Sequence, residues 1–315
     1  MPSFQGLSTA NAFLPSLARP AANVTDAFLR LGLDTFAGLF FQTKVGNLQT
    51  PDLALAQASS EVQLYLNHLL RAGPLNWFQS KWRFNNAIDT VNDFVRPLVE
   101  RTLPYQDAHA GPDKDEHSTF LYSLSRVTSD PKMIRDQIVS VLAAGRDPTS
   151  YTMSWMFYHL AMRPDLVQGL RKEILDRLGD RRPTMDDLKA LRLVRRTIDE
   201  TLRLYPPIPF TGKVAASNAT LPRGGGQDGL SPIGVLKDTA ISYSPMILQR
   251  RADCYPPASA DFPDPLDFAP ERWDRWTPEP GHYIPFSMGP RTCPGQEFSM
   301  TYMTYVTVRI LQTHG

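Results

Sequence analysis

The sequence predicts a mainly α-helical protein with a small β region. Apolar residues recur at helical spacing over much of residues 22–206, the pattern of helices that bury one face. Beyond residue 207, proline and glycine become dense and short alternating runs such as residues 239–243 follow, as in strands joined by turns. The chain has 315 residues, 42% hydrophobic and 21% charged, a composition typical of a globular protein with one large or two medium domains.

Charge and cysteine content exclude several classes of protein. The formal net charge is +1, so nothing indicates binding to nucleic acid. Cys254 and Cys293 are the only cysteines, which excludes a disulfide framework and favours a reducing compartment. No apolar run is long enough to cross a bilayer, and residues 1–20 lack the features of a signal peptide. We therefore expect the chain as given to be soluble or peripheral to a membrane.

The first helices follow an irregular N-terminal segment, residues 1–21. Apolar stripes at residues 62–70 and 94–99 indicate two helices, and the polar run 104–116 indicates a surface loop. A long apolar helix is expected over residues 132–159.

Two further helices are expected after this long one. The first opens at Pro164 and ends near Gly179, because glycine is favoured just beyond a helix C-terminus. The second begins at residues 184–187, which resemble a capping box with Asp in the place of Glu or Gln. It runs to Leu204, where residues 205–207 (YPP) stop it.

Residues 207–276 predict a β patch followed by an irregular meander. The three glycines 224–226 fit either a phosphate cradle or a hairpin turn. The hairpin is favoured, because no Gly-Lys-Ser/Thr follows them and no apolar strand leads into them. A last apolar helix is expected over residues 299–313.

The strongest chemical signal is the run FSMGPRTCPG at residues 286–295. It matches F-x-x-G-x-R-x-C-x-G at all five fixed positions, which a random chain of this length does with a probability of about one in ten thousand. The alternative is a buried structural thiol in a Pro/Gly turn. Zinc is excluded because no second Cys or His lies near Cys293. Cys254 has no such surroundings and is expected to be an ordinary thiol.

This pattern is the haem-binding signature of the cytochrome P450 family, which the chain resembles. The resemblance implies a haem b whose iron takes the Cys293 thiolate as its axial ligand, which favours O–O cleavage. Gly289 and Gly295 would let the backbone bend around the sulfur. Phe286 would keep water from the sulfur, and Arg291 would pair with a haem propionate.

Two further motifs fall in the order of the family. Residues 200–203 (ETLR) match the E-x-x-R of the K helix, and residues 270–273 (PERW) match P-E-R-F with Trp for Phe. The resemblance implies a buried ion-pair network of Glu200, Arg203 and Arg272 behind the haem. On its own, E-x-x-R is more often a solvated helix pair.

Residues 144–149 (AGRDPT) resemble the oxygen-activation motif of the family's long I helix. The resemblance implies that Ala144 and Gly145 open a groove over the iron and that Asp147 relays protons. Pro148 stands in the place of a threonine, so it supplies no hydroxyl. Our hypothesis is that Asp147 and Thr149 deliver protons instead. The alternative is an ordinary kinked core helix.

The branch of the family is indicated by four stretches, residues 205–209, 213–215, 221–226 and 249–253. They are similar to fungal alkane and fatty-acid ω-hydroxylases, which implies a long-chain aliphatic substrate. Lys213 stands where an arginine often binds a propionate. The pocket is expected to be lined by residues 207–210 and by residues near Leu142 and Ala143.

The resemblance implies an incomplete cytochrome P450 domain over residues 22–315. Its expected parts are residues 22–206 (the helical part with the I, J and K helices), 207–280 (the β patch and meander) and 281–315 (the Cys-ligand loop and the start of the L helix). The membrane anchor, the first helices and sheet, and the C-terminal hairpin of the family are expected to lie outside this chain.

The resemblance also implies partners and a location. These are NADPH-cytochrome P450 reductase on the proximal face near Cys293, O2, a hydrophobic small-molecule substrate and the endoplasmic reticulum membrane. Two alternatives to a monooxygenase stay open: a truncated remnant without catalysis, and a haem-binding protein without turnover.

Overall fold

A computed structural model describes residues 23–48, 54–103, 120–259 and 262–313. Its helices are α2 Val24–Phe41, α3 Ala54–Ala72, α4 Trp82–Thr102, α5 Phe120–Ser125, α6 Pro131–Ala161, α7 Pro164–Leu178, α8 Met185–Ala190, α9 Arg192–Leu204, α10 Pro245–Leu248 and α11 Gln296–Thr313. The short 3-10 helices are η2 Gly73–Phe78, η5 Ala252–Cys254, η6 Pro270–Asp274 and η7 Gly289–Arg291. The strands are β1 Thr211–Val214, β2 Ala219–Gly225, β3 Ser231–Val235 and β4 Ala240–Tyr243. The mainly helical prediction is confirmed, whereas the expected N-terminal segment 1–21 and the loop 104–116 lie outside the described residues.

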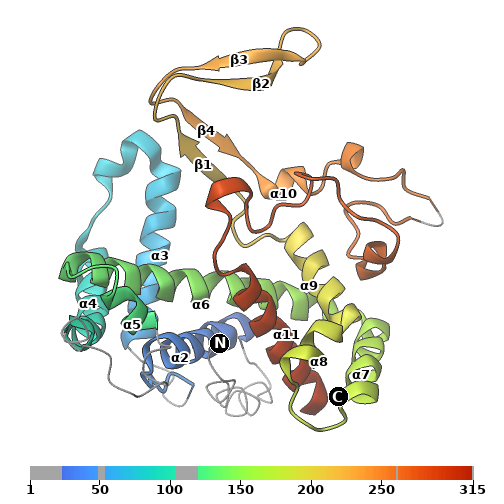
Figure 1. The fold of residues 1–315 in the computed structure, drawn as a ribbon, viewed down its shortest axis with the longest axis horizontal. Coiled ribbons are helices and arrows are strands. Elements are labelled where there is room, and N and C mark those ends of the chain that lie inside the picture. The colour runs from blue at the N-terminus through green and yellow to red at the C-terminus, as the bar shows by residue number, and fades with distance from the viewer. Residues whose placement is uncertain (1–22, 49–53, 104–119, 260–261, 314–315) are drawn as a thin grey trace.

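Helix α6 is the axis of the helical body, and α2, α4, α7, α9 and α11 all contact it (Figure 1). It begins where the sequence predicts, because the Asp130 side chain accepts a hydrogen bond of 2.9 Å from Lys132 N and Pro131 occupies the first turn. One side of the helix forms the core with the buried residues Ile134, Ile138, Leu142, Met153, Met156 and Leu160.

Helices α2 and α6 pack unusually closely at Gly145. A Cβ added to Gly145 would lie 2.0 Å from Cε1 of Phe36, and one added to Gly32 would lie 3.0 Å from Oγ of Ser150. Gly145 therefore has a packing role, since only hydrogen at this position leaves room for the Phe36 ring.

We expect Gly145→Ala to lower the free energy of unfolding by about 1–3 kcal/mol, because the added methyl overpacks the α2–α6 contact. Thermal unfolding followed by circular dichroism measures the change. The matched control is Gly169→Ala in α7, where the added Cβ would meet only Leu193 Cδ2 at 3.4 Å. Equal melting temperatures for Gly145→Ala and the unsubstituted chain would contradict this packing.

The caps predicted around α7 and α8 are confirmed. Gly179 has a φ of 53° and its N–H donates to Leu175 O at 2.9 Å. The capping box forms with Asp: Thr184 Oγ1 accepts from Asp187 N at 3.3 Å, and Asp187 Oδ2 accepts from Thr184 N at 2.9 Å.

The single helix expected from residue 184 to 204 is wrong, because the chain breaks between α8 and α9 at Leu191. The cause is a carboxylate from another helix. Glu173 of α7 accepts hydrogen bonds from Leu193 N at 2.9 Å and from Val194 N at 3.2 Å. These bonds satisfy the first N–H groups of α9 and so stabilise a new helix start there.

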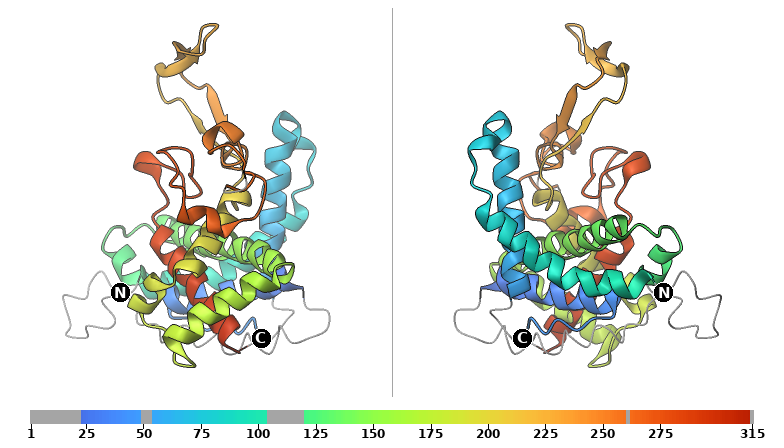
Figure 2. Two further views of the ribbon diagram at one scale, coloured as in Figure 1. Left: turned by 90° about the vertical axis from the view of Figure 1, so that its right-hand side faces the viewer. Right: turned by 90° about the vertical axis from the view of Figure 1, so that its left-hand side faces the viewer.

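The β region consists of two antiparallel pairs, β1 with β4 and β2 with β3. The predicted hairpin turn follows β2: Gly224 N donates to Gly229 O at 2.8 Å, and Gly226 and Gly229 have φ values of 75° and 69°. This hairpin projects from the helical body in every view (Figure 1 and Figure 2). Within the described ranges, no helix combines the length and the apolar composition needed to cross a membrane.

Candidate active site

The loop that carries Cys293 is closed by its own backbone. Cys293 N donates to Phe286 O at 2.9 Å, and Thr292 N donates to Gly289 O at 3.0 Å. Ser287 and Gly289 have φ values of 64° and 74°, in the left-handed region that favours glycine. The glycine of the motif is therefore needed where the loop turns back toward Cys293.

The Cys293 thiol is free and partly exposed, and α11 begins just beyond it at Gln296. A Cβ added to Gly295 would lie 3.8 Å from Cys293 Sγ, an ordinary contact. Phe286 is half-buried and packs against the hydrophobic core.

The turn of α6 at Gly145 is linked to the first turns of α11 by a shared aromatic cluster. The Phe36 ring, which packs on Gly145, lies 5.1 Å from the ring of Phe298 in α11. Ala143 and Ala144 are exposed on α6. Pro148 has no N–H to donate to Ala144 O, so that carbonyl is left without its helical partner.

Asp147 and Thr149 are both buried, with exposures of 6% and 2%. The Thr149 hydroxyl donates to Gly145 O at 2.7 Å. Asp147 Oδ1 lies 3.4 Å from Nη1 of Arg146 and has no hydrogen-bond partner among the described residues. Burial raises the pKa of the Asp147 carboxyl, against the opposing effect of the Arg146 guanidinium. The carboxyl can therefore hold a proton more readily than an exposed aspartate.

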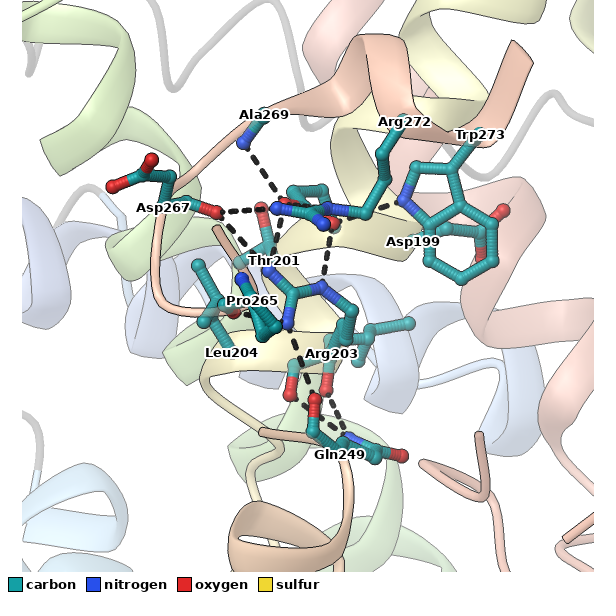
Figure 3. Close-up of polar contacts among 12 residues, drawn as sticks. Asp199, Thr201, Arg203, Leu204, Gln249, Pro265, Asp267, Ala269, Arg272 and Trp273 are labelled. Atoms are coloured by element: carbon teal, nitrogen blue, oxygen red, sulfur yellow. Dashed lines mark hydrogen bonds and ion pairs between the residues drawn. The ribbon is translucent and has the colours of Figure 1, made fainter. Parts of the chain in front are cut away.

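Glu200 lies at the centre of a buried polar network. Arg203 donates to its two oxygens through Nε and Nη2, both at 2.8 Å, and Arg272 Nε donates to Oε1 at 2.9 Å. The Trp273 indole N–H (3.0 Å) and the Ala269 N–H (2.9 Å) complete the set. The three charged side chains are at most 1% exposed. Figure 3 shows both guanidinium groups and the indole converging on one point.

This network joins α9 to the meander. Nη1 of Arg203 donates to Pro265 O at 2.6 Å, and Nη2 donates to Asp267 O at 3.1 Å. Arg272 Nη2 donates to Asp267 O as well, at 3.0 Å. Both arginines thus donate further hydrogen bonds to backbone carbonyls, as a buried guanidinium requires.

Gln249 connects the network to the Cys293 loop. Its Nε2 donates to Leu202 O at 3.1 Å and to Arg203 O at 3.0 Å, while its Oε1 accepts from Ile284 N at 2.8 Å. The residue is fully buried. In the sequence, Gln249 stands out only as part of a stretch similar to the fungal hydroxylases, and Trp273 only as a replacement for Phe. For Trp273 the signal was present, because an indole has an N–H donor that phenylalanine lacks.

Lys213 lies in β1 opposite Ile241 of β4, and its side chain is exposed. The sheet is linked to the Cys293 loop by a hydrogen bond of 3.3 Å between Tyr243 OH and Ser287 Oγ. The side chains of Lys213 and Arg291 make no ion pair with any residue in the described part of the chain.

These residues fit a haem held by a thiolate. The thiol is free and partly exposed, small residues are exposed on the neighbouring turn of α6, and two cationic side chains have no counter-charge in the described structure. Cys293 would ligate the iron, while Arg291 and Lys213 would meet the propionates.

Comparisons with known proteins point to one family. The model of the cytochrome P450 family matches residues 15–314. The chain is 41% identical over 294 residues to cytochrome P450 monooxygenase pvhE of Talaromyces variabilis, covering 93% of this chain and 54% of that protein. It is 32% identical over 313 residues to cytochrome P450 52A4 of Candida maltosa, covering 92% and 56%.

A third relative is cytochrome P450 52A1 of Candida tropicalis, 38% identical over 249 residues, which cover 76% of this chain and 44% of that protein. The chain thus spans about half the length of the curated relatives it matches. The cofactor of the family is a haem with an axial cysteine thiolate. From its motifs, its folded loop around Cys293 and these matches, the chain belongs to the cytochrome P450 family.

Proposed function

We propose that this chain is the core of a haem-thiolate monooxygenase, which inserts one oxygen atom of O2 into a C–H bond. The observation that carries the proposal is the free, partly exposed Cys293 thiol just before α11, a helix whose Phe298 packs on the Phe36 ring beside Gly145 of α6. A haem b ligated by Cys293 supplies the activation of O2. The chain supplies the thiolate, the shielding by Phe286 and the cations Arg291 and Lys213.

Proton delivery is assigned to Asp147 and Thr149. The buried Asp147 carboxyl, with its raised pKa, holds a proton. The Thr149 hydroxyl donates to Gly145 O and keeps its lone pairs to accept a hydrogen bond from a water molecule that carries the proton. Because Pro148 has no N–H, the Ala144 carbonyl can accept a hydrogen bond from a water molecule placed between Asp147 and Thr149.

The substrate we propose is a long-chain alkane or fatty acid. Support comes from the similarity of residues 205–209 and 221–226 to fungal ω-hydroxylases and from the relatives named cytochrome P450 52A. Ile208 and Phe210 are 54% and 60% exposed after the end of α9 and can contact an aliphatic chain. Residue Leu142, expected in the pocket lining, is buried in the core, while Ala143 is exposed.

We also propose NADPH-cytochrome P450 reductase as the electron donor, docked on the face around Cys293. The endoplasmic reticulum membrane is the location proposed from the resemblance to the family.

The test is reconstitution of the chain with haem, reductase, NADPH and dodecanoate. We expect hydroxylated dodecanoate, identified by mass spectrometry. Thr149→Ala is expected to reduce product formed per NADPH by about tenfold and to release hydrogen peroxide instead, because the hydroxyl that positions the proton-carrying water is lost. Thr149→Ser keeps the hydroxyl and is the matched control.

A second candidate function is haem binding without turnover, which the absence of a hydroxyl at Pro148 favours. The monooxygenase proposal would be overturned if a chain that holds haem on a thiolate consumed NADPH no faster with dodecanoate than without it. That result would favour this second function. If Thr149→Ala formed as much product per NADPH as the unsubstituted chain, Thr149 would have no role in proton delivery.

A further inference from the structure

A cavity of about 650 Å³ lies between α2, α3, α4 and α6. Its size is within the range of ligand pockets, about 300–1,000 Å³. Figure 1 and Figure 2 show α3 projecting from the helical body. Its lining includes Leu29, Ser60, Leu64, Trp82, Asn86 and Arg146.

Arg146 is a buried cation at this cavity, with an exposure of 3%. Its contacts are long: Nε lies 3.4 Å from Leu29 O, Nη2 lies 3.2 Å from Ser60 Oγ, and Nη1 lies 3.4 Å from Asp147 Oδ1. A guanidinium has five N–H donors, and a buried one is stabilised only when they are well paired. By contrast, the buried Arg203 makes contacts of 2.6 and 2.8 Å. Arg146 therefore has donors to spare for an anion.

The other charges in the described lining are already paired. Asp26 accepts from Arg30 at 2.6 Å, and Glu61 accepts from Arg83. Among the described residues, Arg146 forms an ion pair with Asp147 alone, and Asp147 is not part of the lining. One positive charge is complementary to a single negative charge, as on a carboxylate, rather than to a doubly charged phosphate.

The rest of the cavity is suited to an apolar chain. Its apolar lining includes Leu64 and Trp82, which are 49% and 69% exposed, and the half-buried Leu29. We propose that this cavity binds a single-chain carboxylate amphiphile, with its carboxylate on Arg146 and its alkyl chain across Leu64 and Trp82. Burying these side chains gives the alkyl chain its affinity.

This site is separate from the Cys293 side of α6. At 3.6 residues per turn, Arg146 and Ala144 point about 200° apart around the helix. Arg146 contacts α2 and α3, whereas Ala144 is exposed on the opposite face. The cavity is thus a second binding site and not the proposed substrate pocket. A carboxylate bound there shares Arg146 with Asp147.

The test uses the full chain and a twelve-carbon carboxylate with a photoreactive diazirine at its far end. After irradiation, mass spectrometry locates the label. We expect the label in α3 and α4, near residues 60–64 and 82–90, with dodecanoate competing and dodecanol not competing. Arg146→Gln is expected to reduce labelling by about tenfold or more, because the charge-assisted hydrogen bonds are lost.

The control is Arg135→Gln, which removes an exposed arginine from the same helix and should leave labelling unchanged. If circular dichroism shows that Arg146→Gln does not fold, Leu64→Asp decides, since Leu64 is exposed and a charged side chain there removes the apolar contact with the alkyl chain. Three results would each overturn the proposal. Labelling could persist in a folded Arg146→Gln or in Leu64→Asp, the label could be found only outside α3 and α4, or dodecanol could compete as well as dodecanoate.

Discussion

Glu200→Gln is expected to lower the free energy of unfolding by about 3–5 kcal/mol, the usual effect of removing one partner of a buried ion pair. The substitution keeps the shape of the side chain but removes its charge. Arg203 and Arg272, both at most 1% exposed, then stay buried without a counter-charge. Chemical denaturation followed by circular dichroism measures the change.

Two variants calibrate this expectation. Trp273→Phe removes a single donor to Glu200 and should lower the free energy of unfolding by about 1–2 kcal/mol. Asp136→Asn breaks an exposed ion pair of α6 and should leave the midpoint almost unchanged. A Glu200→Gln midpoint equal to that of Asp136→Asn would show that the network does not stabilise the fold.

The effect of Glu200→Gln should extend to the Cys293 loop. Arg203 is hydrogen-bonded to Gln249 O at 3.2 Å, and Gln249 holds Ile284 N at 2.8 Å, just before Phe286. A loosened network therefore loosens the segment that leads into the loop. Weaker haem retention should accompany the lower stability.

The sequence predicted the elements whose signals are local. Helix α6 was expected over residues 132–159 and spans Pro131–Ala161, because its cap at Asp130 and its first-turn proline lie next to it in the chain. The hairpin at glycines 224–226 was predicted for the same reason. The break at Leu191 was missed, because the carboxylate that starts α9 belongs to Glu173 in another helix.

The candidate site shows the same division. The turn of the backbone around Cys293 could be predicted, because the glycines that allow it and Cys293 belong to one contiguous motif. The contact of Gly145 with Phe36 and the hydrogen bonds of Gln249 depend on residues far apart in the chain. No periodicity in a single sequence reports such contacts, since they are created by the packing of one element on another.

Cys293→Ala is expected to abolish thiolate ligation of the haem completely. The described residues around the loop include no other cysteine, and Cys254 lies in η5, a separate segment. Alanine has no group that binds iron, so no substitution of similar size restores the bond. Cys254→Ala removes the second thiol of the chain and is the matched control.

The measurement that tests this account most directly is the carbon-monoxide difference spectrum of the reduced, haem-reconstituted chain. We expect the strongly red-shifted Soret band of a thiolate-ligated haem in the unsubstituted chain and in Cys254→Ala, and its loss in Cys293→Ala. No haem uptake by the unsubstituted chain, or the same red-shifted band in Cys293→Ala, would contradict the assignment of Cys293 as the iron ligand.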